Sequence, residues 1–525
     1  MKKQVLKQIK KYKLEVLLFL VSLSLFVGLA YYLVFELQFL FGDALSRTFH
    51  AYAVFFGNNP KLASIGLVWP PVPTLVQLPF VLIKPLNVFG FAGNVVSSLF
   101  MASTVLVVYK SLLLLKLTKI EGFLLSVLFL VNPMILFYGA NGMSEAIAIF
   151  FYSLSTYHLI QYLKKGKIPT IIAMSISVSL AVMSRWEMVL LIPILITSLG
   201  VHTFLKVRRN RLTRSEAYIL IFATPVAFTI LVWLIFNFTI MNDTFHFMKS
   251  IYSNSAQSAS LIQSSNSFAQ LKGNILMTTG YVLIRVFYAQ LFFFPLSFLV
   301  ALKAIVSKNK VLYGSLVATP LAIVCFHLLL LYKGQSFGWL RFFIYVIPST
   351  YLLLALVLTD IKKQANRRLI FIISTILLIG SSLWTARAMS LPTIGREENK
   401  TINAILYQDK SFIANDTYEE DVEVAQYILT QTKNRILVDD FTGFPIVYYT
   451  DKPSRFIETI DNDFDLALED PYAFSDLDYF LVRKKEGVGD LDAINRKYPS
   501  MYENGAGIAT LEKDFGVWRL YKLTK

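Results

Sequence analysis

The sequence predicts a polytopic α-helical membrane protein with a C-terminal mixed α/β domain outside the membrane. The 525 residues are 55% hydrophobic and only 16% charged, with a mean hydropathy of +0.56. Apolar runs of about 16 to 24 residues recur from Leu14 to Trp384, close to the ~20 residues that a helix needs to cross a bilayer. Residues 386–525 differ, with 25 acidic and 17 basic side chains and short strand-like runs. We therefore predict a membrane domain, 1–385, and an extracytoplasmic domain, 386–525.

The apolar runs predict about eleven transmembrane helices. We expect them near residues 14–35, 90–109, 122–138, 146–162, 169–184, 187–205, 216–238, 276–300, 311–331, 340–359 and 368–385. The first run has no small-residue cleavage site after it, which indicates a retained signal anchor. In the first outer loop, 36–89, five prolines between Pro70 and Pro85 make a continuous lipid-facing helix costly. We therefore expect Pro70–Leu86 to be an interfacial or re-entrant element.

Lysine and arginine are distributed unequally between the two sides of the predicted membrane domain. The N-terminal segment and one set of loops hold 24 Lys and Arg, whereas the alternate loops hold 8. This bias predicts a cytoplasmic N-terminus and an extracytoplasmic C-terminal domain. The lysine-rich ends and the lack of a disulfide favour a prokaryotic plasma membrane, but an endoplasmic reticulum protein, with a lumenal outer face, would share this topology. The net charge of +16 is spread over many loops. Because a nucleic-acid site gathers its basic residues on one folded face, we predict no nucleic-acid partner.

The predicted extracytoplasmic domain shows both strand and helix patterns. Strand-like runs lie at Arg435–Asp439, Pro445–Tyr449, Tyr479–Arg483 and Val517–Leu523, and amphipathic helical stretches at Val422–Thr432 and Leu491–Lys497. Its acidic groups are Asp439 with Asp440, and Asp461 with Asp463 and Asp465. These groups lack the glycine and the distal glutamate of a calcium loop. We therefore expect a solvated acidic surface.

Charged and aromatic residues near the outer ends of the spans form the candidate site. They are Asp43, Arg47, His50, Trp69, Glu145, Arg185, Glu187, Arg285, Lys333 and Arg341. By the predicted topology, most of these side chains lie at one level, the outer membrane face. Arg285 falls inside a span, where an arginine is costly unless it meets a partner. Asp43 and Arg47 are one turn apart, so they share a face if their segment is helical.

Several of these residues also have a purely structural interpretation. Arg185 and Glu187 would be interfacial charges that cap a tight turn, and the basic residues of the loop 332–341 would extend to the lipid headgroups. Glu145 would be a solvated acid at a helix end, His50 a structural histidine and Trp69 an interface anchor. The sequence alone leaves both interpretations open.

The order of several short motifs resembles the C-type glycosyltransferase superfamily. The motifs are Asp43 in the first outer loop, Trp69-Pro70-Pro71, Asn132-Pro133 ahead of Met143-Ser144-Glu145, Ser184-Arg185-Trp186-Glu187, and Trp339-Leu340-Arg341-Phe342-Phe343 followed by Pro348. The chain looks similar to the protein mannosyltransferase and aminoarabinose transferase branch over roughly residues 14–360. The resemblance implies a multispan core, an acidic residue in a long first outer loop and a polyprenyl-phosphate-linked sugar as donor.

Three departures from the pattern of that branch bear on the site. Trp69 stands where many relatives have His or Lys before the Pro-Pro pair. Ala44 follows Asp43, where a second acid is common. The sequence also lacks the Trp-Trp-Asp signature of the oligosaccharyltransferases. That absence argues against transfer of a preassembled oligosaccharide to asparagine.

The candidate residues suit transfer of a sugar from a polyprenyl phosphate. Asp43 would take the acceptor proton, and direct displacement would invert the anomeric centre. Arg285 and Arg341 would stabilise the leaving phosphate, since arginine bonds phosphate at two points. Glu145 would hold sugar hydroxyls or assist the base. We assign catalysis to Asp43 and Glu145, and donor-phosphate or substrate binding to Arg47, Trp69, Arg185, Glu187, Arg285, Lys333 and Arg341.

The expected partners are the donor lipid, an extracytoplasmic acceptor (protein, lipid or glycan) and the bilayer. The transferred sugar would be a hexose or pentose of the cell envelope. No spacing demands a cofactor, and binding of a divalent metal by Asp43, Glu145 and His50 stays open. The alternative function is a transporter or flippase of a glycolipid or small solute, which usually shows paired repeats with helices broken at the midplane. A non-catalytic scaffold would not need Asp43 or Arg285.

Overall fold

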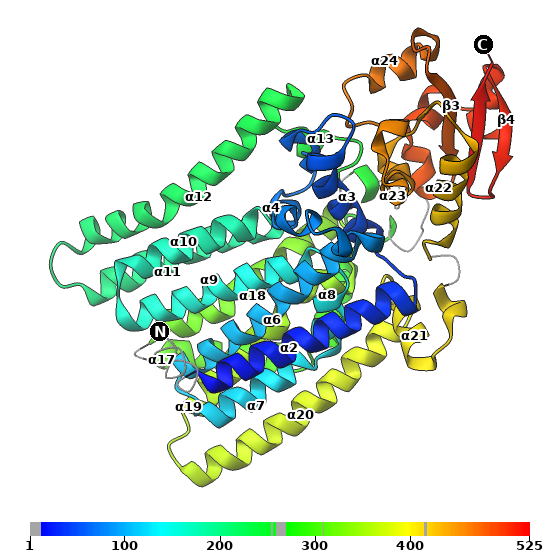
Figure 1. Ribbon diagram of the computed structural model, residues 1–525. Coiled ribbons are helices and arrows are strands. Elements are labelled where there is room, and N and C mark those ends of the chain that lie inside the picture. Colours follow the sequence, from blue (N-terminus) through cyan, green and yellow to red (C-terminus); the bar gives the residue numbers. More distant parts are fainter. Residues whose placement is uncertain (1–11, 254–255, 259–268, 308, 414–416, 525) are drawn as a thin grey trace, which may run out of the picture. The chain divides into compact units, whose positions relative to one another are not determined.

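The computed structural model describes residues 12–253, 256–258, 269–307, 309–413 and 417–524. The chain forms two compact units (Figure 1). The helical unit comprises Met1–Ala30, Val68–Val72 and Asn94–Phe412, and the sheet unit comprises Tyr31–Leu67, Pro73–Gly93 and Ile413–Lys525. This division differs from the predicted boundary at residue 385. Most of the first outer loop belongs with the C-terminal residues, and residues 386–412 belong with the helices.

The helical unit contains the helices that the apolar runs predict and two short helices that they do not predict, His246–Lys249 and Asn399–Tyr407. They are α2 (Lys13–Tyr31), α6 (Phe91–Leu114), α7 (Lys119–Leu130), α8 (Pro133–Ala140), α9 (Glu145–Lys165), α10 (Ile168–Val182), α11 (Leu191–Lys206), α12 (Arg211–Met241), α13 (His246–Lys249), α16 (Ile275–Ala289), α17 (Phe293–Val306), α18 (Lys310–Lys333), α19 (Val346–Thr359), α20 (Gln364–Ser390) and α21 (Asn399–Tyr407). Two predicted spans are bent, by 66° between α7 and α8 and by 96° between α16 and α17. Pro133 is the first residue of α8, where proline is tolerated because its missing N–H has no intrahelical partner.

Among the described residues, fewer helices than predicted have the length and hydropathy of a membrane span. Helices occupy all eleven predicted positions. Among the described residues, seven are long and apolar enough to span, or nine if each bent pair is one span. The remaining two predicted spans are α9 and α10. α10 has only 15 residues, and α9 carries serine, threonine, histidine and charged side chains that lower its hydropathy.

The outer helices of the helical unit expose apolar faces. α12 and α20 lie at opposite edges of this unit in Figure 1, and only 17% of the apolar stretch of each is buried. The corresponding stretch of α19 is 89% buried, so α19 belongs to the interior of the unit. Extended exposed apolar faces are typical of surfaces that meet lipid. This arrangement agrees with a multi-pass membrane protein.

The sheet unit contains a five-stranded sheet with the order β2-β1-β3-β5-β4. The strands are β1 (Arg435–Leu437), β2 (Phe456–Ile457), β3 (Leu477–Arg483), β4 (Ala509–Asp514) and β5 (Trp518–Leu523). β1 pairs in parallel with β2 and β3, whereas β5 pairs antiparallel with β3 and β4. Its helices include α3 (Gly42–Phe56), α22 (Glu419–Gln431), α23 (Asp440–Thr450), α24 (Phe464–Glu469), α25 (Ala493–Lys497) and α26 (Met501–Asn504). The predicted fold class, a helical membrane part with a small C-terminal α/β part, is confirmed.

One predicted strand, Pro445–Tyr449, is wrong. The segment lies inside α23, whose N-terminal cap is Asp439. Ile446 and Val447 are fully buried in the core of the sheet unit. A short apolar run of this kind gives the same pattern in a buried strand and in a buried helix, so the sequence does not separate the two. The other three predicted strands and both predicted helices are present.

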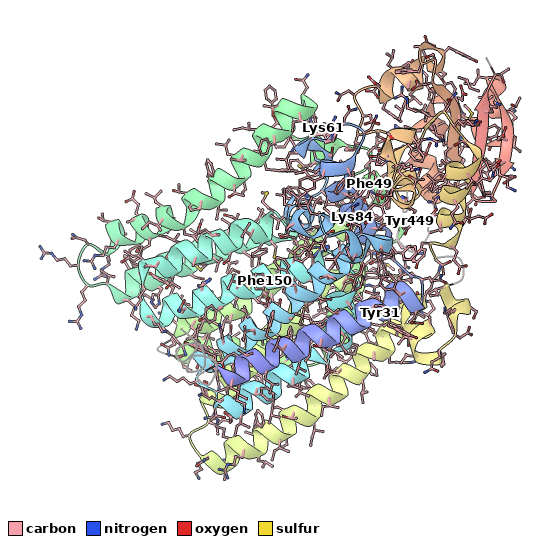
Figure 2. The ribbon with its side chains drawn as sticks, viewed as in Figure 1. Tyr31, Phe49, Lys61, Lys84, Phe150 and Tyr449 are labelled. Carbon is pink, nitrogen blue, oxygen red and sulfur yellow. The ribbon has the colours of Figure 1, made fainter. Side chains whose placement is uncertain are left out.

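The first outer loop is folded onto the C-terminal residues within the sheet unit. Leu45, Phe49 and Tyr52 of α3 share one apolar core with Ile446 and Val447 of α23. Figure 2 labels Phe49 together with Tyr449, which packs against the same core. The Tyr52 hydroxyl also donates a hydrogen bond to Asp451 at the end of α23. The apolar face of α3 therefore fixes this helix to the C-terminal residues.

The segment Pro70–Leu86 forms short helices instead of one long helix. They are α4 (Val72–Leu75), α5 (Leu78–Val81) and a 3₁₀ turn at Lys84–Leu86. Thr48 of α3 donates a hydrogen bond to Gln77 Oε1 at 2.8 Å, and both side chains are buried. The prolines interrupt the helix as expected.

The expected solvated acidic surface is wrong for three of its five residues. Asp439, Asp440 and Asp461 are buried, whereas Asp463 and Asp465 are exposed. Asp439 follows β1 and accepts hydrogen bonds from the backbone N–H groups of Phe441 and Ala493 at 2.9 and 2.6 Å. The acids are buried because they close the connections after the parallel strands, a tertiary feature that their spacing in the sequence does not show.

Burial raises the pKa of several acids in this part of the sheet unit. Burial and the neighbouring Asp439 raise the pKa of Asp440 to about 7. The same two causes raise the pKa of Asp492 to about 7. Burial, with Asp440 and Asp461 nearby, holds the pKa of Glu458 well above its usual range. The folded sheet unit therefore binds more protons than the unfolded chain between about pH 4 and pH 7.

We expect the stability of the sheet unit to fall as pH rises. A carboxyl whose folded pKa is raised contributes stability that is present below its unfolded pKa and is lost as pH rises through its folded pKa. For Asp440 that loss falls between about pH 4 and pH 7, on the order of 1–4 kcal/mol. Thermal unfolding of the full chain in detergent at pH 5 and pH 8 measures it. Asp440→Asn should flatten the pH dependence, whereas Asp463→Asn, at an exposed position, should not. Equal slopes in both variants would contradict the assignment.

Candidate functional site

Four of the sequence-predicted residues meet in the helical unit. They are Glu145, Arg185, Glu187 and Arg341, which come from three different connections between helices. Two tyrosines and two further glutamates join them. We call this set the ionic cluster, and its members are Tyr138, Glu145, Arg185, Glu187, Arg341, Tyr345, Glu397 and Glu398.

Glu145 is the central carboxylate of the ionic cluster. It is the first residue of α9 and is 0% exposed. Its Oε1 atom accepts a hydrogen bond from Arg185 Nη1 at 2.5 Å and lies 3.4 Å from Arg341 Nε. Its Oε2 atom has no hydrogen-bond partner among the described residues. One carboxylate oxygen of Glu145 therefore joins two arginines.

The turn before α9 fixes the position of Glu145. Gly142 has a φ of +79°, a conformation that other residues rarely adopt. Its N–H donates to Ser97 Oγ at 3.1 Å, and Asn94 Nδ2 donates to the Ala140 carbonyl at 2.8 Å. Both partners lie on α6. The Asn141-Gly142-Met143-Ser144 segment is thus tied to a neighbouring helix, so that α9 starts at a defined place.

Arg185 connects Glu145 to a second glutamate. Its Nε atom donates to Glu187 Oε1 at 2.5 Å, and the Tyr345 hydroxyl donates to the same oxygen at 3.1 Å. The Arg185 side chain remains 14% exposed, compared with 4% for that of Arg341. Arg185 is therefore the more accessible of the two arginines to an incoming anion.

The Trp69-Pro70-Pro71 motif is attached next to this turn. The N–H of Val72 donates to the carbonyl of Met183 at 2.9 Å, two residues before Arg185. Trp69 itself is half-buried. The structure therefore places the backbone of the motif beside the Arg185 turn within the helical unit.

Arg341 is the most enclosed cation of the ionic cluster. It lies in the 3₁₀ turn Leu340–Phe343 and is 3% exposed. Its Nε atom lies 2.8 Å from Glu397 Oε2, and its guanidinium carbon lies 4.4 Å from the ring centre of Trp339. Its Nη1 atom also contacts Met143 Sδ at 3.8 Å. The predicted outer loop thus contributes a buried arginine, and the interpretation of Arg341 as a headgroup contact does not fit its burial.

Sequence reasoning missed Glu397 and Glu398. The Tyr138 hydroxyl donates to Glu398 Oε1 at 2.5 Å. Burial raises the pKa of Glu398, against the opposing effect of the Tyr138 hydrogen bond. These glutamates lie beyond the last predicted span, in a segment that we assigned to the acidic extracytoplasmic domain. The sequence feature that could have revealed these two residues is a pair of adjacent glutamates that follows the last predicted span.

Arg285 lies beside the ionic cluster and donates hydrogen bonds to the backbone of two loops that contribute residues to it. Its Nε atom donates to the carbonyl of Gly338 at 2.6 Å, and its Nη2 atom to that of Thr393 at 3.2 Å. Its guanidinium carbon lies 3.2 Å from the ring centre of Tyr281. The expectation that a buried Arg285 meets partners is confirmed. Because Gly338 and Thr393 precede Arg341 and Glu397 by three and four residues, Arg285 ties together the two loops that supply them.

The remaining sequence-predicted residues lie outside the ionic cluster. Lys333, the last residue of α18, is exposed. Asp43, Arg47 and His50 belong to α3 of the sheet unit, with Asp43 exposed in its first turn. Their spacing of four and three residues places the three side chains on one face of this helix. His50 Nδ1 lies 3.0 Å from the carbonyl oxygen of Ser64.

The arginines of the ionic cluster lie in a mostly buried, low-dielectric environment, an arrangement that suits the binding of an anion. Two arginines and three ion-paired glutamates lie together, with Arg341, Glu145 and Glu187 buried and Arg185 and Glu397 partly exposed. Such burial is costly unless every charge is paired. Arginine also bonds phosphate at two points, so a phosphate group can exchange with a carboxylate at the same guanidinium. Among the described residues, no group of three or more His, Cys, Asp or Glu side chains is arranged to hold a metal ion.

Comparisons with known proteins found a family model and several solved structures similar to this chain. Residues 70–236 match a family model described as dolichyl-phosphate-mannose-protein mannosyltransferase. The crystal structure of ArnT from Cupriavidus metallidurans bound to undecaprenyl phosphate is 12% identical, with a TM-score of 0.53, and the match covers 97% of each chain. The archaeal oligosaccharyltransferase AglB from Archaeoglobus fulgidus, in complex with an inhibitory peptide and a dolichol-phosphate, is 10% identical, with a TM-score of 0.49 over 91% of this chain and 70% of that chain. No curated protein sequence matches the chain.

We expect Glu145→Ala to destabilise the helical unit by about 3–5 kcal/mol, because it leaves two buried arginines without their shared carboxylate. Thermal unfolding of the full chain in detergent measures the change. Lys333→Ala, which removes an exposed charge, should alter the free energy of unfolding by less than about 0.5 kcal/mol. An effect of Glu145→Ala as small as that of Lys333→Ala would show that the ionic cluster does not stabilise the unit.

Proposed function

We propose that this chain transfers a sugar from a polyprenyl-phosphate donor to an extracytoplasmic acceptor. Its resemblance to the C-type glycosyltransferase superfamily is confirmed by the family model and by its fold. The observation that carries the proposal is the buried ionic cluster in a helical unit of this fold. A lipid-linked donor needs a site that binds phosphate at the level of the bilayer. The cluster offers arginines at the ends of membrane helices, where the lipid tail can remain in the hydrocarbon.

The arginines of the ionic cluster would stabilise the leaving group. As the bond between the anomeric carbon and the phosphate oxygen breaks, the electron pair and a negative charge move onto the phosphate. Arg185 and Arg341 are held in place before the reaction by Glu145, Glu187 and Glu397. Such preorganised donors act most strongly in a site that excludes water. Arg285 is then a positioning residue, because its own N–H groups hold backbone carbonyls.

Asp43 would serve as the base. Its carboxylate would take the proton of an acceptor hydroxyl while the acceptor oxygen forms the new bond to the anomeric carbon. Attack opposite the departing phosphate would invert that centre. The exposed place of Asp43 in the first turn of α3 supports this role, since the carboxylate is accessible to an acceptor. Arg47, one turn further along α3, would contact the phosphate or the acceptor.

The sheet unit would set the position of the base. α3 and α23 share one apolar core, so packing against the C-terminal residues fixes the position of Asp43 within the sheet unit. We therefore assign this unit a role in presenting Asp43 to the acceptor. The Lys and Arg distribution supports a cytoplasmic N-terminus and an extracytoplasmic sheet unit.

Loss of the base gives the direct test. We expect Asp43→Asn to lower the rate at which isolated membranes convert a polyprenyl-phosphate sugar to polyprenyl phosphate by about 10²–10⁴-fold, as is typical when a general base is removed. Mass spectrometry of the extracted lipids measures both species.

The matched control is Glu419→Gln, an exposed acid in the first turn of α22 in the same unit. It should leave the conversion rate within about two-fold, since surface substitutions rarely perturb the fold. Conversion by Asp43→Asn at the rate of the control would eliminate Asp43 as the base. Transport of the sugar lipid without conversion, by the unaltered protein, would favour a flippase.

A further inference from the structure

A second polar site lies at the end of the helical unit opposite Glu145. The pocket has a volume of about 410 Å³ and is lined by side chains near the ends of α6, α9, α11, α18 and α19. Four lysines face it: Lys116, Lys164, Lys206 and Lys310. We call it the lysine pocket. Glu145 and Lys164 lie near opposite ends of α9, whose length separates the two sites by about 30 Å.

Within the described ranges, carboxylates do not balance the four lysines of the lysine pocket. Its one carboxylate, Asp360, already accepts a hydrogen bond from Tyr313 at 2.9 Å and lies 3.2 Å from Lys303 Nζ. Among the described residues, no carboxylate lies within ion-pair distance of Lys116, Lys206 or Lys310. Like charges that line one pocket repel one another, so the pocket favours an anion.

The start of α18 adds to this preference. Asn309, Lys310, Val311 and Leu312 line the pocket, and α18 begins at Lys310. The first N–H groups of a helix have no intrahelical acceptor and carry a partial positive charge. The lysine pocket therefore combines four cations with the N-terminal end of a 24-residue helix, a combination suited to a phosphate group.

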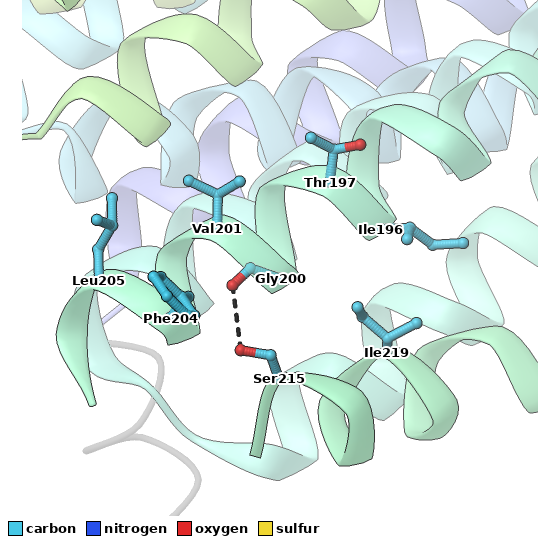
Figure 3. A pocket seen from close by; sticks show the side chains of 8 residues that line it. All are labelled: Ile196, Thr197, Gly200, Val201, Phe204, Leu205, Ser215 and Ile219. Carbon is cyan, nitrogen blue, oxygen red and sulfur yellow. Dashed lines mark hydrogen bonds between the residues drawn. The ribbon is translucent and has the colours of Figure 1, made fainter. Parts of the chain in front are cut away.

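An apolar groove adjoins the lysine pocket. The groove lies between α11 and α12, with a volume of about 360 Å³, and Figure 3 shows the eight side chains that line it. Its two hydroxyls are satisfied locally, since Ser215 Oγ donates to the Gly200 carbonyl at 3.3 Å and Thr197 Oγ1 to the Pro193 carbonyl at 2.8 Å. The remaining lining is hydrocarbon or backbone. Leu205 lines both the groove and the lysine pocket, so the two lie next to each other.

We propose that the lysine pocket and the groove bind one anionic phospholipid. Its phosphate-bearing headgroup would lie among Lys116, Lys206 and Lys310, and one acyl chain would follow the groove between α11 and α12. The charge of the pocket and the apolar lining of the groove match the two parts of such a lipid. With a cytoplasmic N-terminus, the site faces the leaflet in which anionic lipids attract basic segments. The inference concerns binding and does not depend on the proposed transferase activity.

The test compares lipids on the full chain in detergent. Native mass spectrometry and thermal unfolding would be followed during titration with dioleoyl phosphatidylglycerol, dioleoyl phosphatidylcholine or inorganic phosphate. The pocket variant combines Lys116→Gln, Lys206→Gln and Lys310→Gln. Its control combines Lys119→Gln, Lys165→Gln and Lys362→Gln, with the same change in charge at the same end of the helices but outside the pocket lining.

We expect phosphatidylglycerol to bind more tightly than phosphatidylcholine. The pocket variant should weaken phosphatidylglycerol binding by about 10²-fold, since three basic residues near a lipid surface each contribute about five-fold. The control variant should change it by less than about three-fold. Val201→Trp, which fills the groove from an exposed position, should also weaken binding. This single substitution keeps the lipid proposal testable if the triple pocket variant does not fold.

Three outcomes would overturn the proposal. If the pocket and control variants lost the same amount of phosphatidylglycerol affinity, the lipid would be attracted only by the overall positive charge and not by the pocket. Equal binding of the two lipids would show that the lysines do not recognise the headgroup. Stabilisation by inorganic phosphate as great as that by phosphatidylglycerol, unaffected by Val201→Trp, would identify a site for free phosphate instead of a lipid.

Discussion

The shared contact of Glu145 with Arg185 and Arg341 is the constraint on which the helical unit depends. A carboxylate at the start of α9 is stable in a buried position only because it meets both guanidinium groups. Those arginines come from connections about 40 and 200 residues later in the chain, as the sequence positions show. Arg341 in turn requires Glu397, and Arg285 holds the backbone of both loops. Paired charges thus fix these helix ends, where we propose that the phosphate of the lipid-linked donor binds.

The sheet unit imposes a different kind of constraint on the proposed base. Asp43 lies on a helix whose apolar side is built into the core of the C-terminal residues through Leu45, Phe49 and Tyr52. The first outer loop and the C-terminal residues therefore fold as one compact unit, although more than 300 residues separate them in the sequence. Hydrocarbon packing positions α3, whereas paired charge positions the arginines. The proposed reaction needs both, because one supplies the base and the other receives the leaving group.

Sequence patterns predicted the elements that depend on local composition. Long apolar runs located the long described helices of the membrane part but not the short α13 and α21. The predicted topology brought Glu145, Arg185, Glu187 and Arg341 to one level. Features set by tertiary packing were missed. Pro445–Tyr449 looked like a buried strand but is a buried helix, and Asp439 and Asp440 looked solvated but close the end of a parallel strand. Glu397 was placed in the extracytoplasmic domain because nothing local shows that its partner, Arg341, precedes it by 56 residues.

The central claim, consumption of a polyprenyl-phosphate sugar, is tested most directly by lipid analysis of cells that lack this protein and of the same cells restored with it. Mass spectrometry of the polyprenyl monophosphate sugars is the measurement. The account predicts that one such lipid accumulates in the deleted cells and falls when the protein is restored, which would also identify the donor. An unchanged set of sugar lipids in the two strains would contradict the account.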